Sequence, residues 1–167
     1  NKPGNVYIGL VHRLDRPVGG VMVFARSSKA ASRLNKEQLE HGFCKKYMAV
    51  VNGCFDIKRG RFIDKLKKLS DGNTIVSSDG KEAILDYEVV SENKSTNHSL
   101  VKIQLVTGRH HQIRVQFASR GHALCGDQRY GKLDKTQLAL FAYELTFTHP
   151  ISKEKMTSEV IIDAQPK

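Results

Sequence analysis

The sequence predicts an α+β fold: a mainly antiparallel mixed β-sheet with flanking helices, and with loops that form a cleft. Three observations support this class. Short apolar runs bounded by Gly, Ser and Asn outnumber helical patterns, and the links between them are typical of hairpins rather than of helical crossovers. A chain of 167 residues can also bury the core of one compact domain, and it contains no internal repeat.

The first half of the chain predicts two strands and one helix. Residues 21–25 form a short apolar run, so we expect a buried strand there. Either Ser27 or Ser28 can cap the helix that follows, and Gly42 can end it. Residues 47–51 form a second apolar run, which an Asn-Gly turn pair closes.

The second half predicts three further strands and a second helix. Residues 55–80 are polar and basic, and we expect a hairpin or a long loop. Residues 84–90 and 100–106 should pair as strands around a polar turn. A short helix is expected at 111–119, and a last strand at 140–147.

The chain is strongly basic. It has 27 Lys and Arg against 17 Asp and Glu, a formal net charge of +10. A small domain with this charge attracts polyanions, of which nucleic acid is the commonest. Lys65, Lys67 and Lys68 make the 55–80 segment positive, although a charge run of this kind can also be only a solvated face.

The cysteines and apolar runs exclude several classes of protein. Cys44, Cys54 and Cys125 contain no C-x-x-C pair, which argues against a zinc site and against a disulfide framework. Reduced thiols are typical of the cytoplasm. No apolar run reaches the roughly 18 residues of a membrane span, and the start lacks a signal-peptide apolar region. We therefore expect a cytoplasmic protein without membrane or metal partners.

A charged loop carries the first candidate site residue. Residues 12–20 read HRLDRPVGG, in which Asp15 lies between Arg13 and Arg16. The proline at 17 disfavours helix, so Asp15 should lie on a loop. Nearby positive charge favours the ionised carboxylate, which suits a nucleophile or a base. The alternative is a surface ion pair with either arginine.

A second polar segment lies at the start of the second predicted helix. Residues 107–115 read TGRHHQIRV, with Arg109 before the helix and Arg114 inside it. The alternative for Arg114 is a solvated helix face. Because His110 and His111 are adjacent, they point to different helix faces and make a poor metal pair.

Four segments resemble, in the same order, the motifs of the RluA-like family of RNA pseudouridine synthases. Residues 12–20 are similar to H-R-L-D-x-x-(T/S)-(S/G)-G, and residues 107–115 are similar to T-G-R-x-H-Q-I-R. Residues 45–50, KKYMAV, resemble K-x-Y-x-A-V. Residues 121–131 resemble G-H-P-L-x-G-D-x-x-Y-G. Agreement at all four motifs is not a chance event.

The resemblance implies that the chain isomerises specific uridines in structured RNA, either ribosomal or transfer RNA, to pseudouridine without a cofactor. It implies that Asp15 is the essential catalytic residue, that Tyr47 stacks on the target base and removes the last proton, and that Arg114 pairs with Asp15. Without the resemblance, Tyr47 is simply a core tyrosine of the sheet. The other residues expected to contact RNA are Arg13, His12, Arg109, His111, Gln112, Lys65, Lys67 and Lys68.

We expect residues 1–167 to form one catalytic domain that lacks part of the family's N-terminal region. Family domains carry a longer stretch before H-R-L-D, whereas only eleven residues precede His12. Residues 1–4, NKPG, lie too close to Asp15 to be the family's N-K-P-A-G segment. We also expect no accessory RNA-binding domain of the S4 type, and a monomer.

Two other functions fit parts of the sequence. One is a catalytically idle RNA-binding module, which the short N-terminal region suggests. The other is an RNA-cleaving enzyme that uses His12 with His110 or His111 as acid and base. This second alternative leaves Asp15 and Tyr47 without a role.

Overall fold

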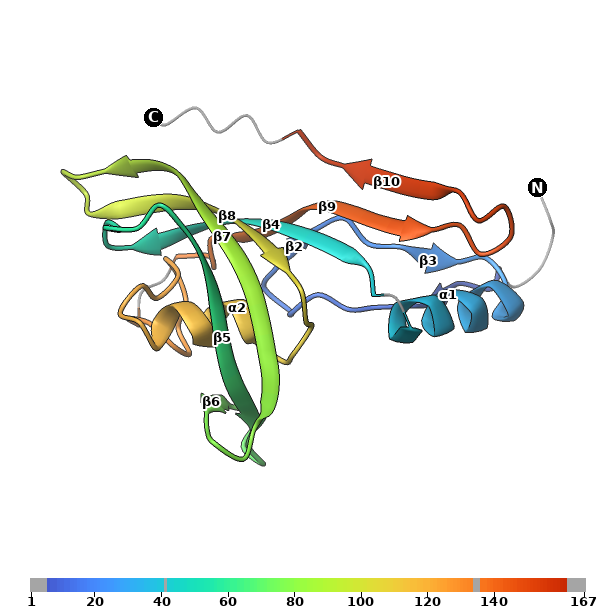
Figure 1. Ribbon diagram of the computed structural model, residues 1–167, viewed down its shortest axis with the longest axis horizontal. Coiled ribbons are helices and arrows are strands. Elements are labelled where there is room, and N and C mark those ends of the chain that lie inside the picture. The colour runs from blue at the N-terminus through green and yellow to red at the C-terminus, as the bar shows by residue number, and fades with distance from the viewer. Residues whose placement is uncertain (1–5, 41, 134–135, 162–167) are drawn as a thin grey trace.

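One large β-sheet dominates the structure, a computed structural model that describes residues 6–40, 42–133 and 136–161 (Figure 1). In chain order the elements are β1 (Gly9–Leu10), β2 (Gly19–Gly20), β3 (Phe24–Ala25), α1 (Ser28–Glu40), β4 (Cys44–Asn52), β5 (Arg59–Lys68), β6 (Thr74–Val76), β7 (Lys81–Asn93), β8 (His98–Leu105), α2 (Gln112–Ala118), β9 (Leu140–Thr148) and β10 (Lys155–Glu159).

The order of the strands confirms the predicted fold class. Along the sheet the order is β10-β9-β4-β8-β7-β5-β6, and each neighbouring pair is antiparallel. β2 lies off this path and pairs with β9 in parallel, which makes the sheet mixed. The predicted helices and the predicted strands of β4, β7, β8 and β9 are confirmed, with boundaries that differ by a few residues.

The predicted buried strand at 21–25 is wrong in its extent. Only Phe24–Ala25 is a strand, and it pairs with β1 in a separate small sheet. The reason is that the Val21 N–H donates to the carbonyl of Ala142, so the chain first follows β9 and then departs from it. Phe24 is 48% exposed, so only Ala25 is buried there.

The basic segment at 55–80 is an ordered hairpin rather than a long loop. β5 pairs with β7 along its length and with the short β6 at its end, and this part of the sheet extends away from the rest (Figure 1). Cross-strand ion pairs, Arg59 with Glu88 and Arg61 with Asp86, lie on its exposed face. Such pairs add to the stability of the strand pair, whose other face buries Phe62, Leu66, Ala83 and Leu85.

The last strand, β10, was not predicted from the sequence. β10 was not predicted because its side chains are all exposed and show no apolar alternation, yet it pairs along β9. The N-terminal segment at 1–4 lies outside the described residues. Gly42, predicted to end the first helix, has a φ of 72°, a left-handed conformation that favours glycine.

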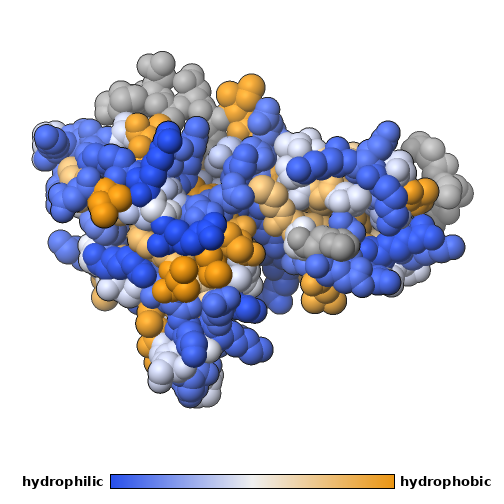
Figure 2. All heavy atoms as spheres, in the orientation of Figure 1, coloured by the Kyte–Doolittle hydropathy of each residue, from blue (hydrophilic) through white to orange (hydrophobic). Residues whose placement is uncertain are grey.

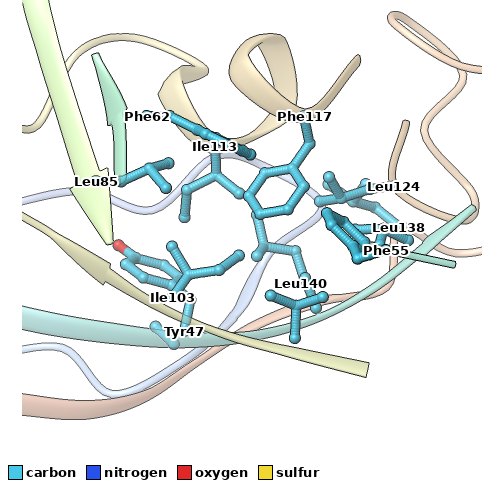
Figure 3. Close-up of a cluster of buried hydrophobic side chains, with 14 residues drawn as sticks. Tyr47, Phe55, Phe62, Leu85, Ile103, Ile113, Phe117, Leu124, Leu138 and Leu140 are labelled. Atoms are coloured by element: carbon cyan, nitrogen blue, oxygen red, sulfur yellow. The ribbon is translucent and has the colours of Figure 1, made fainter. Parts of the chain in front are cut away.

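The main core lies between α2 and one face of the sheet (Figure 3). Phe117 of α2 is fully buried and meets the rings of Phe55 and Phe62 edge-on, at centroid distances of 6.4 and 5.1 Å. Figure 3 shows Tyr47 at the border of this cluster. The packing of α2 therefore fixes the helix relative to β4, and both elements carry predicted site residues.

A second core lies under α1, and His12 packs against it. The cluster includes Leu34 of α1, Phe43, and Leu145 of β9. His12 is only 7% exposed, and it meets the Phe43 ring edge-on. Its Nε2 accepts a hydrogen bond from the Val23 N–H at 3.2 Å. These contacts favour a packing role for His12, and its contact with RNA stays a prediction.

Replacing His12 should reduce the acid sensitivity of the fold. Burial and the nearby Lys45 lower the pKa of His12 from 6.5 to about 4. Because the unfolded chain then binds more protons between those values, stability falls as the pH falls from 6.5 toward 4. At pH 5 this loss amounts to about 2 kcal/mol. Urea unfolding of His12→Gln should therefore show a smaller difference in stability between pH 7 and pH 5 than wild type shows.

The control for this experiment is His98→Gln, which removes a half-buried histidine from β8. It makes the same substitution at a histidine outside the second core. If His12→Gln shows the same difference in stability between pH 7 and pH 5 as wild type, His12 is protonated in the folded protein at pH 5.

Candidate active site

A pocket of about 110 Å³ brings the three predicted catalytic residues, Asp15, Tyr47 and Arg114, together. It lies where the loop after β1, the first residues of β4 and the start of α2 meet. The residues that line it are Arg13, Leu14, Asp15, Val18, Lys45, Tyr47, Leu105, Gly108, Arg109, His111, Gln112, Ile113, Arg114 and Leu140. Charged groups therefore share this pocket with an apolar wall.

The loop that carries Asp15 is tied to the sheet by a close backbone contact. The Val18 N–H donates to the Asp15 carbonyl at 2.9 Å and closes a turn. Gly20 then pairs with Ala142 of β9. Gly20 has a φ of 135°, and a Cβ atom there would lie 2.2 Å from the Ala142 carbonyl oxygen. Only glycine allows this approach, so position 20 fixes where Asp15 lies.

β4 supplies one wall of the pocket through its alternating side chains. Tyr47 faces the same side as Ala49 and Val51, which are buried in the main core. Lys45 lies two residues earlier on that face and also lines the pocket. One face of β4 thus passes from the core into the pocket. Lys45 was not predicted as a site residue, although it is the first residue of the K-x-Y motif.

Arg114 connects two carboxylates. Its Nε and Nη2 atoms donate to the Oδ2 and Oδ1 atoms of Asp127, both at 2.8 Å. Its Nη1 lies 3.5 Å from Asp15 Oδ2, which forms a looser ion pair. The Arg114 side chain is 8% exposed and that of Asp127 is fully buried. The bidentate pair therefore orients the guanidinium, which presents its remaining edge to Asp15.

Asp127 is a site residue that the sequence reasoning did not identify. Besides pairing with Arg114, its Oδ1 accepts hydrogen bonds from the backbone N–H groups of Arg129 and Tyr130 at 3.0 and 3.1 Å. These contacts and the arginine lower the pKa of Asp127 against the opposite effect of burial. The Gly-Asp pair of the fourth motif could have pointed to Asp127, but it did not indicate that Asp127 binds Arg114.

His111 lies beside Asp15 in the same pocket. Its Nε2 is 3.8 Å from Asp15 Oδ2, and its Nδ1 is 2.7 Å from the hydroxyl of Tyr130. Burial is the main reason that its pKa is lowered to about 4, and it outweighs the opposing effect of the Asp15 carboxylate. His111 is therefore neutral at pH 7.

Two of the predicted RNA-binding residues shape the pocket wall through contacts within the protein. Gln112 is 2% exposed; its Oε1 accepts from the Thr107 hydroxyl and the Arg109 N–H, and its Nε2 donates to the Ile84 carbonyl. These bonds use the polar atoms of Gln112 within the protein, and its contact with RNA stays a prediction. Arg109 donates from Nε to the Glu82 carbonyl at 2.7 Å and remains at the pocket's edge.

The predicted basic run lies beside the pocket rather than in it. Lys67 and Lys68 line a neighbouring groove of about 320 Å³, and Arg109 lines both the groove and the pocket. Lys67 forms an ion pair with Asp79. Lys65 is exposed on the same strand, and hydrophilic side chains cover most of the face seen in Figure 2.

The electrostatics of the pocket disfavour one predicted role. Burial and then the charge of Asp15 raise the pKa of Tyr47 to about 12. The phenol therefore stays protonated at neutral pH, which argues against Tyr47 as the base that removes the last proton. Burial also lowers the pKa of Lys45. The ring of Tyr47 remains available as a flat surface at the pocket.

The described residues contain neither a metal-binding cluster nor a helix that could span a membrane. Within the described ranges, no group of three or more His, Cys, Asp or Glu side chains is placed to hold a metal ion. Neither α1 nor α2 is long and apolar enough to cross a membrane.

Comparison with known proteins identifies the family. The profile described as RNA pseudouridylate synthase matches residues 1–119, which is more than half of the chain. The chain belongs to the RNA pseudouridylate synthase family. This confirms the resemblance to RluA-like synthases that the four motifs indicated.

Individual members of the RNA pseudouridylate synthase family agree along most of the chain. A tRNA pseudouridine synthase C from Haemophilus influenzae is 34% identical over 93% of this chain and 74% of its own length. A ribosomal large subunit pseudouridine synthase C from Buchnera aphidicola is 33% identical over 97% of this chain and 55% of its own. The chain spans about half the length of other curated relatives that it matches.

A solved structure supports the fold. The chain titled Human RNA Pseudouridylate Synthase Domain Containing 1 superposes with a TM-score of 0.85, over 96% of this chain and 71% of that chain. At 22% sequence identity, the similarity is one of fold. The mixed sheet described above is thus also the fold of the matched part of that solved chain.

Removing the carboxylate of Asp127 should destabilise the protein strongly. Asp127→Ala leaves the buried Arg114 guanidinium without its main partner, which costs about 3–5 kcal/mol. Asp86→Ala is the matched control, because Asp86 also holds an arginine with two hydrogen bonds, but on the exposed face of β7. That variant should lose less than about 1 kcal/mol. Urea unfolding measures both values, and equal losses would contradict the importance of burial.

Proposed function

We propose that this chain isomerises uridine to pseudouridine in RNA and that Asp15 is the essential catalytic group. The observation that carries the proposal is the arrangement around Asp15. A carboxylate with 27% of its side chain exposed lies at a pocket beside an arginine that a second carboxylate orients. The Asp15 carboxylate is therefore accessible from the pocket, which the reaction requires.

The chemistry of the reaction fits the residues of the pocket. The N1–C1′ bond breaks, the detached uracil turns, and C5 bonds to C1′ while it loses its proton and N1 gains one. A carboxylate here can attack C1′, add to C6 or remove the C2′ proton, and each route needs a charged oxygen at the sugar–base bond. The reaction requires no redox change, so the residues of the chain suffice for it.

The walls of the pocket support the turning of a detached base. The target uridine must leave its helix and enter a pocket that holds it by stacking. Tyr47 offers an aromatic ring, and stacking on such a ring contributes about 1–3 kcal/mol per base. Leu105, Ile113 and Leu140 provide apolar surface against which uracil can turn without a fixed hydrogen bond. Arg13, exposed at the rim, can occupy the place left in the RNA.

We propose structured ribosomal or transfer RNA as the substrate class. The names of the relatives from Buchnera and Haemophilus carry these two classes. The basic groove that continues from the pocket suits the phosphates flanking the flipped nucleotide. Comparing both RNA classes in the assay below decides between them.

Asp15→Asn should abolish the isomerisation, because asparagine is neither a useful nucleophile nor a base. The measurement is tritium release from ribosomal or transfer RNA labelled at uridine C5. Wild type should release tritium and the variant should not. RNA binding should persist in the variant, because the amide keeps the size of the carboxylate.

Two results would count against this assignment. Full tritium release by Asp15→Asn would remove Asp15 from the chemistry. RNA binding by wild type without release would instead identify a catalytically idle RNA-binding module.

Neutralising Lys65, Lys67 and Lys68 together should flatten the salt dependence of RNA binding. Each lost phosphate contact lowers the slope of log affinity against log salt by about 0.7–0.9. The control replaces Lys29, Arg33 and Lys36, three exposed cations of α1, with the same change in charge. α1 lies at one end of the molecule's long axis, away from β5 and β6, so its variant should keep the slope (Figure 1). Equal slopes in both variants would show that the lysines on β5 are only a solvated face.

A further inference from the structure

His111 holds an unusual backbone conformation immediately before α2. Its φ and ψ are 51° and 25°, in the left-handed region that residues other than glycine rarely adopt. This conformation directs the imidazole between Asp15 and Tyr130, and its side chain is 11% exposed. The ring of His110 lies against it, with centroids 3.7 Å apart. The backbone thus places this ring at the catalytic carboxylate.

Tyr130 determines which nitrogen of His111 carries the proton. The backbone N–H of Thr74 donates to the Tyr130 hydroxyl oxygen at 3.0 Å. An amide nitrogen cannot accept, so the phenolic hydrogen remains available for His111 Nδ1 at 2.7 Å. The Nδ1 of His111 is then the acceptor, and the proton of the neutral ring lies on Nε2.

The charge on the other side of the ring favours the same tautomer. Nε2 faces Asp15 Oδ2 at 3.8 Å, where a bare ring nitrogen would repel the carboxylate and an N–H attracts it. This distance is too long for a direct hydrogen bond, and such contacts tighten in substrate complexes. The other charged neighbours of the ring are Arg114 and Arg129.

We infer that His111 is a positioning residue for Asp15: its Nε2–H and the Arg114 guanidinium both hold Oδ2 and leave Oδ1 for the substrate. The inference rests on the proposed function and extends it, because it names which carboxylate oxygen reacts. Arg114 Nη1 lies 3.5 Å from Oδ2, and His111 Nε2 lies 3.8 Å from the same oxygen. A carboxylate held at one oxygen cannot rotate its second oxygen away from the sugar.

The tautomer is measured directly by nitrogen-15 NMR of the labelled histidines. The chain has 7 histidines, and the signals that disappear in His111→Gln identify residue 111. In wild type at pH 7, the His111 pattern should be that of a ring protonated at Nε2. In Tyr130→Phe, which removes the hydroxyl and keeps the ring beside the Arg114 guanidinium, the pattern should shift toward protonation at Nδ1. A wild-type ring protonated at Nδ1 would overturn the inference.

Two substitutions at 111 separate positioning from folding. Asparagine tolerates the left-handed backbone and can accept from Tyr130, but it is too short to present an N–H to Asp15. Glutamine reaches further, and its amide N–H can replace Nε2–H. We expect kcat to fall roughly 10- to 100-fold in His111→Asn with little change in KM, and His111→Gln to recover part of that loss.

We expect His111→Asn to be the more stable variant and His111→Gln to be the more active one. If His111 only maintains the fold, His111→Asn should be at least as active as His111→Gln, because asparagine suits the backbone better. That result would contradict the inference. A wild-type chain that releases no tritium contradicts the proposed function instead, while the NMR experiment still determines the tautomer.

Discussion

The buried ion pair between Arg114 and Asp127 is the interaction on which the rest of the site depends. A guanidinium that is 8% exposed needs an opposite charge, and the fully buried Asp127 supplies it through two hydrogen bonds. Asp127 is itself fixed by the backbone of the loop that follows it. Because α2 carries Arg114 and also packs Phe117 into the main core, the same helix aligns the core and the charge.

This arrangement separates two tasks that carboxylates often share. Asp127 compensates the arginine and is inaccessible, whereas Asp15 remains partly exposed and is held loosely at 3.5 Å. A single carboxylate bonded twice to Arg114 would be stable but less available to a substrate. The second aspartate thus keeps Arg114 in place while Asp15 stays available for chemistry.

Much of the fold follows from the sequence, because apolar alternation and turn residues report local structure. The alternation in β4 places Tyr47 on the core side, and Gly42 ends α1 as expected. The failures occurred where long-range contacts decide. The exposed β10, which was not predicted, is held by its neighbour β9, and β5, for which a loop stayed open beside a hairpin, is held by its pairing with β7. Neither contact leaves a periodic signal in the chain.

The sequence predicted which residues form the candidate site better than it predicted the contacts between them. The motifs placed Asp15, Tyr47 and Arg114 together, and the pocket contains all three. They could not distinguish His12, which packs in the second core, from residues of the pocket. They also did not indicate the partner of Arg114, because a pair formed across a loop depends on backbone geometry that the residue types do not encode.

The pairing of Gly20 with Ala142 has a consequence for synthesis of the protein. These residues lie far apart in the sequence, so their contact is highly non-local, and such contacts are slow to form in folding. On the ribosome, the loop with Asp15 leaves before β9 and remains untethered until β9 has followed. The nascent chain therefore has no assembled pocket until β9 has been translated.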